Sequence, residues 1–272
     1  MSLNPSSPAP GVRLDLPSLA GSDAAAARSS AGRPGLLGQG LLRLLTHRAT
    51  VGAVHELSST LRLVSLRAAS FRDLAEVPGD KVQLRVSGMS FRTFTPFRLG
   101  GPADELLVLG HVHGWGPGSD WLGGVAPGEP CHVLGPRRSL DLGTIQRSTV
   151  FFGDETSLGL ARALCSTPLG AVDTHFIFET GDAYGMRQAL EALGEGMLRN
   201  AWLVERRAVD GHLPEIEAAF ARYAAADAYR QYVLSGRAPA VQRLVRGLRG
   251  AGAKPSQVLA KAYWAPGKVG LD

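Results

Sequence analysis

Arg92-Thr93-Phe94-Thr95-Pro96-Phe97-Arg98 is the stretch around which the rest of the chain is organised. Polar and apolar residues alternate just before it, over residues 81–86, which is the pattern of a half-buried β-strand. We therefore expect Arg92, Phe94 and Thr95 at or near the end of a strand. There a guanidinium can bind a phosphate, an aromatic ring can stack on a flat heterocycle, and a hydroxyl can hydrogen-bond a ring nitrogen or a ribityl oxygen.

A second segment, His113-Gly114-Trp115-Gly116-Pro117-Gly118-Ser119, follows an apolar run over residues 105–109. Gly-Pro-Gly-Ser is a turn signal by itself. Here it also predicts the start of a short helix, where backbone N–H groups point outward and attract an anion. Together the two segments place two phosphate-binding features around one aromatic ring, which is the arrangement that a flavin nucleotide needs.

Residues 49–142 have the pattern of an antiparallel β-barrel. Short strand-like segments are separated by turn signals at Pro78-Gly79-Asp80, Gly100-Gly101-Pro102 and Pro127-Gly128-Glu129. The six predicted strands are residues 49–56, 61–67, 81–86, 92–97, 105–111 and 131–135.

From residue 148 the pattern changes to strands that alternate with helices. The predicted strands are residues 149–152, 174–179, 201–205, 231–234 and 258–263. The predicted helices are residues 155–165, 186–193, 214–226 and 239–249. This alternation predicts a doubly wound α/β domain with a parallel sheet, which binds its ligands at the carboxyl ends of the strands.

Three parts follow from these patterns. Residues 1–34 are rich in Ala, Ser, Pro and Gly and predict a flexible N-terminal tail. Residues 35–145 form the predicted β-barrel domain, and a short amphipathic helix over residues 36–45 leads into it. Residues 146–272 form the predicted α/β domain.

The composition of the 272-residue chain fits a globular protein with a hydrophobic core, since 44% of its residues are apolar. Its net charge of +5 favours anionic ligands such as nucleotides or acidic chelates, although a basic proteome would give the same balance. No block of Lys and Arg indicates nucleic acid, and no apolar run is long enough to span a bilayer. Cys131 and Cys165 lie far apart without a second pair, so neither a zinc site nor a disulfide scaffold is indicated and we expect the reducing cytoplasm. Separately, we expect a monomer.

Three further segments are candidates for ligand binding. Gly153-Asp154-Glu155-Thr156 occupies the first strand-to-helix turn of the α/β part, but it lacks the G-x-G-x-x-G pattern and equally fits an ordinary capped helix. Ser235-Gly236-Arg237 puts a cation on the same edge, either for a phosphate or in a solvated loop. Tyr263-Trp264-Ala265-Pro266-Gly267-Lys268 either packs the domain interface or places Trp264 near a flat cofactor. His111 and His113 have no third metal ligand, so we expect no metal site.

The ordered set of motifs resembles the siderophore-interacting proteins, which are NAD(P)H-dependent ferric-siderophore reductases of the ferredoxin–NADP reductase superfamily. The resemblance covers roughly residues 49–272 and rests on Arg-Thr-Phe-Thr-Pro, His-Gly, Gly-Pro-Gly-Ser-Asp-Trp, Gly-Pro-Arg-Arg-Ser-Leu, Gly-Asp-Glu-Thr, Ser-Gly-Arg and Ala-Tyr-Trp-Ala-Pro-Gly-Lys. One departure is Phe94, where the family often has Tyr, so that stacking is kept but a hydroxyl is lost.

The resemblance implies an FAD-binding barrel and a nicotinamide-binding α/β domain. The FAD-binding residues that it implies are Arg92, Phe94, Thr95, His113, Gly118, Ser119 and Trp264. The NAD(P)H-binding residues are Gly153, Asp154, Glu155, Thr156, Ser235, Gly236 and Arg237. Lys268 and Arg138 would meet the anionic ferric chelate, although the Arg137-Arg138 pair equally suits an FAD phosphate or NADP.

The implied activity is electron transfer from NAD(P)H through FAD to Fe(III) in a siderophore, with release of Fe(II). Arg237 and the basic charge favour NADPH over NADH. The cofactor carries the redox chemistry, and we assign no catalytic acid or base. Two alternatives stay open: another flavin oxidoreductase that reduces free flavin or a protein partner, and a flavin- or siderophore-binding module with little turnover.

Overall fold

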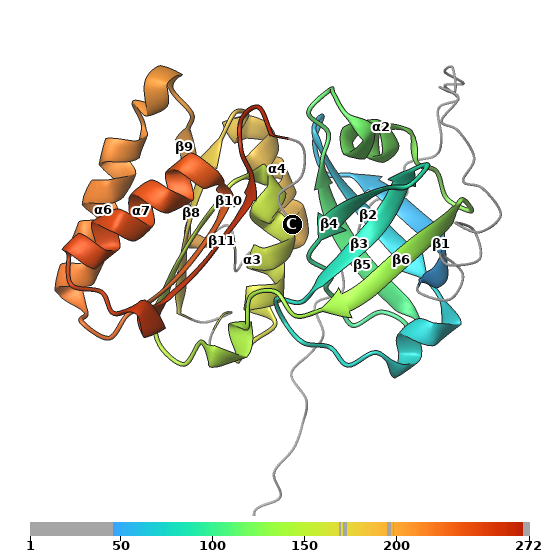
Figure 1. The fold of residues 1–272 in the computed structure, drawn as a ribbon, viewed down its shortest axis with the longest axis horizontal. Helices are drawn as coiled ribbons and strands as arrows, with labels where there is room; N and C mark the ends of the chain where they lie inside the picture. The colour runs from blue at the N-terminus through green and yellow to red at the C-terminus, as the bar shows by residue number, and fades with distance from the viewer. Residues whose placement is uncertain (1–45, 169, 171–172, 195–196, 198, 269–272) are drawn as a thin grey trace, which may run out of the picture.

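The structure is a computed structural model that describes residues 46–168, 170, 173–194, 197 and 199–268. Two β-sheets lie next to each other, one antiparallel and one parallel (Figure 1). The tail predicted over residues 1–34 and the helix predicted over residues 36–45 lie outside the described residues.

The first sheet has six antiparallel strands and curls on itself, as the sequence predicted. The strands are β1 (His47–Glu56), β2 (Leu61–Arg67), β3 (Lys81–Ser87), β4 (Ser90–Phe94), β5 (Glu105–His111) and β6 (Pro130–Arg137). Their order in the sheet is β4-β3-β6-β1-β2-β5. Apolar side chains that alternate along these strands, such as Val64, Leu84 and Val133, fill the inside of the curl.

Strand β4 differs from the strand predicted over residues 92–97, because it begins earlier and ends at Phe94. Pro96 lacks the N–H that would continue the ladder with β3. Phe97 instead exchanges two backbone hydrogen bonds with Leu107 of β5, at 3.0 and 2.9 Å. This bridge draws the two edges of the antiparallel sheet together and leaves Phe94 and Thr95 at a strand end.

The second sheet is parallel and doubly wound, again as predicted. Its strands are β7 (Thr149–Gly153), β8 (Thr174–Thr180), β9 (Ala201–Glu205), β10 (Gln231–Arg237) and β11 (Val258–Trp264), in the order β11-β10-β7-β8-β9. The strand order reverses between β7 and β10. Such a switch point opens a ligand crevice at the carboxyl ends of the strands.

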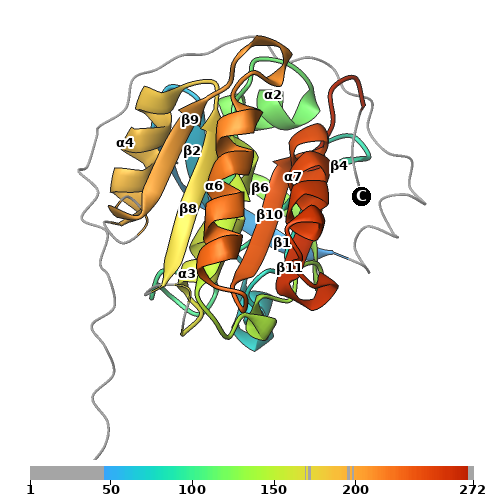
Figure 2. The ribbon, with the colours of Figure 1, turned by 90° about the vertical axis from the view of Figure 1, so that its left-hand side faces the viewer.

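Helices cover both faces of the parallel sheet (Figures 1 and 2). They are α3 (Leu158–Cys165), α4 (Ala183–Leu193), α6 (Leu213–Ala226) and α7 (Ala238–Gly250). Helices α3 and α4 lie between the two sheets, and α6 and α7 cover the outer face. Both views place α2 (Pro117–Gly124), which covers one end of the first sheet, at the same end of the molecule as the carboxyl ends of the parallel strands.

One hydrophobic core runs across the boundary between the sheets. It joins Leu63 and Phe97 of the first half to Leu160, Leu164 and Met186 of the second. Strand β11 adds polar links, because Lys261 Nζ donates to Ser139 Oγ at 2.9 Å. The two halves therefore meet along an extensive packed surface. In the described part of the chain, no helix is long and apolar enough to cross a membrane.

Candidate functional site

Arg92 and the N-terminus of α2 come together, as the paired sequence segments predicted. Arg92 is half-buried on β4, and a Cβ on Gly118 would lie 3.0 Å from Arg92 Cγ, so a larger residue at this position would push the Arg92 side chain away from the helix. One guanidinium nitrogen donates to the Phe91 carbonyl at 2.7 Å. No other acceptor for this guanidinium exists among the described residues. A free, half-buried cation beside the first turn of a helix fits a phosphate group.

Phe94 and Thr95 flank this position at the end of β4. The Phe94 ring lies 6.4 Å from the Trp121 ring of α2, in a tilted arrangement. The Thr95 hydroxyl is buried and hydrogen-bonds the Tyr263 hydroxyl of β11 at 3.0 Å. Burial raises the pKa of Tyr263 to about 12, so this link across the two halves is between neutral groups. Thr95 thus lies beside Phe94 as expected, but its hydroxyl already forms a hydrogen bond with Tyr263.

Ser119 shapes the loop before α2. Its buried hydroxyl accepts the backbone N–H groups of His113 and Gly114, both at 2.9 Å. The His113 ring is exposed and packs edge-on against Trp115, with ring centroids 4.8 Å apart. Ser119 therefore holds the loop through its side chain. Its own backbone N–H, and that of Gly118, lie in the first turn of the helix, where no intrahelical partner is available.

Asp154 lies at the switch point, directly after β7, and is completely buried. Its carboxylate accepts the Thr156 backbone N–H at 2.9 Å and the Trp264 indole N–H at 2.7 Å. Gly236 on β10 packs against the same carboxylate with a φ of +98°, and a Cβ there would come within 2.5 Å of Asp154 Oδ2. These contacts fix the position of the Trp264 indole at the end of β11.

Burial raises the pKa of Asp154 from 3.8 to about 6. The folded protein therefore keeps a proton that the unfolded chain has already released, and the stability contributed by Asp154 is lost as the pH rises from about 4 through about 6. Relative to Asp154→Asn, the wild-type free energy of unfolding is expected to fall by about 2 kcal/mol between pH 4 and pH 7. Guanidinium denaturation at the two pH values measures this, with Asp173→Asn, at an exposed carboxylate, as control. Parallel pH profiles of the wild type and Asp154→Asn would contradict it.

Glu155 is held by the chain itself. It accepts two hydrogen bonds from the Arg206 guanidinium, at 2.9 and 2.7 Å, and one from the Gly181 backbone at 2.7 Å. The Arg206 guanidinium and these hydrogen bonds keep the pKa of Glu155 below its ordinary value despite its burial. The sequence placed Glu155 at the nicotinamide nucleotide, but its side chain serves to tie the carboxyl ends of β7, β8 and β9 together.

Arg237 lies at the carboxyl end of β10, where the sequence placed it, but its guanidinium is already paired. It contacts both carboxylate oxygens of Glu179 on β8, at 3.0 and 3.2 Å, and Asp210 Oδ1 at 2.7 Å. His212 Nε2 lies 2.7 Å from Glu179 Oε2 in the same cluster. The sequence reasoning missed Glu179, Asp210 and His212. Only their places just inside or after the ends of β8 and β9 could have indicated them.

Three further predicted site residues are Ser235, Lys268 and Arg138. Ser235, two residues before Arg237, has a fully buried hydroxyl that lacks a partner in the described part of the chain. Lys268 is exposed beyond the end of β11. Arg138 is exposed after β6 and forms a rim ion pair with Asp141 at 3.2 Å.

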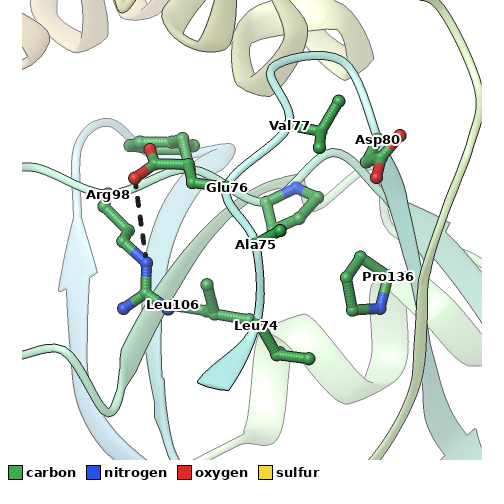
Figure 3. A pocket seen from close by; sticks show the side chains of 10 residues that line it. Leu74, Ala75, Glu76, Val77, Asp80, Arg98, Leu106 and Pro136 are labelled. Atoms are coloured by element: carbon green, nitrogen blue, oxygen red, sulfur yellow. Dashed lines mark ion pairs between the residues drawn. The ribbon is translucent and has the colours of Figure 1, made fainter. Parts of the chain in front are cut away.

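A small cavity lies elsewhere, under the loop before β3 (Figure 3). Its volume is about 30 Å³, and Glu76 and Arg98 line it, 4.0 Å apart, together with Leu106 and Pro136. None of the predicted site residues borders it. It has room for water but not for a flavin, so it is not the cofactor site.

Solved structures show what the fold resembles, whereas no protein-family model and no curated protein matches the sequence. A siderophore utilization protein from T. fusca is 20% identical, with a TM-score of 0.61 over 84% of this chain and 95% of that one. The siderophore-interacting protein SipS from Aeromonas hydrophila is also 20% identical, with a TM-score of 0.62 over 82% and 93%. The chain has the fold of these proteins. The ferredoxin reductase in carbazole 1,9a-dioxygenase shares this fold at 17% identity, with a TM-score of 0.61 over 80% and 69%.

Proposed function

We propose that the protein is an FAD-dependent oxidoreductase that passes electrons from a nicotinamide nucleotide to a ferric siderophore. The observation that carries this proposal is the free guanidinium of Arg92 against Gly118 at the first turn of α2. It provides a cation and helix N–H groups for a pyrophosphate, next to the end of β4, where Phe94 lies. The shared fold with siderophore-interacting proteins supports the same reading.

The proposed site residues have separate roles. Arg92, Gly118 and the backbone of Ser119 hold the FAD phosphates, and Phe94 lies beside the ring system. When bound, FAD supplies the redox chemistry, accepting a hydride and donating single electrons to Fe(III). Thr95 and Tyr263 link the two sheets next to this position, and Asp154 holds the indole of the neighbouring Trp264.

The ferric siderophore is the substrate. Exposed cationic side chains suit an anionic chelate. Lys268 and Arg138 are the residues that we assign to it, because both are exposed and Arg138 has only a weak rim partner. Fe(II) binds oxygen-rich chelators far more weakly than Fe(III), so reduction releases the iron. We place the activity in the reducing cytoplasm, which fits the free thiols of Cys131 and Cys165. We propose that the protein acts as a monomer.

An anaerobic absorbance titration tests the proposal. FAD-loaded protein is treated with NADH or NADPH, and then with a ferric siderophore in the presence of a ferrous trap. Bleaching of the flavin, followed by its reoxidation and the appearance of trapped Fe(II), is the expected result. Protein that takes up no FAD overturns the proposal altogether. Flavin that bleaches but ignores ferric chelates shifts it to the reduction of free flavin or a protein partner, whereas flavin that neither nucleotide bleaches indicates a binding module.

A further inference from the structure

The carboxyl ends of β8, β9 and β10 are where a nicotinamide dinucleotide would be selected, if the proposed function is right. In doubly wound domains ligands bind outside the carboxyl ends of the strands. An acidic side chain there accepts the ribose 2′-hydroxyl of NAD, whereas a nearby arginine accommodates the 2′-phosphate of NADP. In this chain the acidic residue on β8, Glu179, is completely buried, Asp210 after β9 is partly exposed, and the nearby arginine is Arg237.

Arg237 is already paired with two carboxylates. Its side chain is only 9% exposed, and its Nε and Nη2 atoms contact Glu179 and Asp210. His212 Nδ1 accepts the Arg207 backbone N–H at 3.2 Å, so Nε2 carries the proton and donates to Glu179. The two carboxylates of Glu179 and Asp210 outnumber the one guanidinium of Arg237 in this cluster.

Asp210 is the part of this cluster that an incoming nucleotide can reach. Its side chain is 35% exposed, and only one of its carboxylate oxygens contacts Arg237. Hydrogen bonding by Arg237 keeps the pKa of Asp210 below its ordinary value, so Asp210 is an anion at neutral pH. Two arginines that follow β9 are paired as well: Arg206 with Glu155 at 2.7 Å, and Arg207 with Glu215 at 3.2 Å.

Asp210 also lies in an unusual turn. Val209 and Asp210, in the short 3-10 helix Ala208–Asp210, have φ angles of +53° and +57°. The left-handed conformation is rare for a β-branched residue and persists only where the surrounding structure enforces it. The ion pair with Arg237 anchors this turn, so that the free carboxylate oxygen of Asp210 is held at the edge of the sheet.

We infer that the protein takes NADH in preference to NADPH, with Asp210 as the specificity-determining residue. The inference rests on the proposed function and on the neutralised Arg237. The carboxylate of Asp210 accepts the 2′-hydroxyl of NADH, and it repels the two charges that a 2′-phosphate brings to the same place. This reverses the preference for NADPH that Arg237 suggested when it was considered without its partners.

Binding of two small probes to the FAD-loaded protein tests the inference without turnover. Isothermal titration calorimetry compares 5′-AMP with 2′,5′-ADP, which differ by the 2′-phosphate. In the wild type 5′-AMP binds more tightly. Asp210→Asn, a residue that tolerates left-handed φ angles, is expected to raise the affinity for 2′,5′-ADP about fivefold and to lower that for 5′-AMP about threefold, because a neutral amide oxygen accepts the 2′-hydroxyl less strongly than a carboxylate. Asp104→Asn, which removes the same charge from an ion pair with Arg72 in the other half, is the control and changes neither affinity.

Three outcomes would overturn the inference. The first is tighter binding of 2′,5′-ADP than of 5′-AMP to the wild type. The second is an equal change for both probes in Asp210→Asn, which would mean a purely structural role. The third is binding of neither probe, which removes the nucleotide from this edge. The proposed function is judged separately, because FAD that is reduced by dithionite must still reduce the ferric siderophore whichever nucleotide the site takes.

Discussion

Glu179→Ala lowers the free energy of unfolding by about 3–5 kcal/mol, because it leaves the Arg237 charge without its main partner in a buried place. Glu179 is completely buried and accepts hydrogen bonds from both Arg237 and His212. Asp210 alone then remains to pair Arg237, from a partly exposed position. The loss of this cluster also releases the segment between β9 and α6, which Asp210 and His212 anchor.

The chain contains a matched control for this prediction. Glu217 and Arg243, on α6 and α7, form a two-pronged ion pair with both contacts at 2.7 Å, but both side chains are about one-third exposed. Glu217→Ala is therefore expected to cost no more than about 1 kcal/mol. Urea denaturation of the two variants and the wild type measures the difference. Equal losses for Glu179→Ala and Glu217→Ala would mean that burial of the Arg237 cluster does not determine its contribution.

Arg92→Gln raises the Kd for FAD about 30- to 100-fold, which is the loss expected when one charge-assisted phosphate contact is removed. The free guanidinium has no acceptor other than Phe91 O within the described ranges, so its replacement leaves no carboxylate unpaired and has little effect on folding. Arg92→Lys recovers part of the affinity, because it keeps the charge but loses the two-pronged geometry.

Titration of the apoprotein with FAD, followed by the quenching of flavin fluorescence, measures these affinities. Arg48→Gln is the control, since Arg48 is an exposed arginine on β1 of the same sheet. An unchanged Kd in Arg92→Gln would remove Arg92 from the phosphate site and with it the observation that carries the proposed function. A parallel loss in Arg48→Gln would instead point to the overall charge of the sheet.

The element pattern could be predicted closely because it depends on local periodicity. The strands over β2, β5 and β9 have the bounds that alternation and turn residues indicated. Strand β4 was the exception. Its end depends on Pro96 and on the pairing of Phe97 with Leu107 of β5, and β5 lies at the opposite end of the sheet order from β4. The approach of Gly118 to Arg92 was also foreseen, because each segment separately indicated a phosphate.

The sequence by itself determined the two sheets, their order along the chain and the strand ends at which Asp154 and Arg237 lie, because these follow from residue spacing. Only the tertiary structure decided what these side chains and that of Arg92 do. Arg92 finds no acceptor but Phe91 O within the described part of the chain, Asp154 holds Trp264, and Arg237 is paired with Glu179 and Asp210 from two other segments. The physical reason is that the charge available to a ligand depends on partners brought together by the fold, and spacing along one chain does not record those partners.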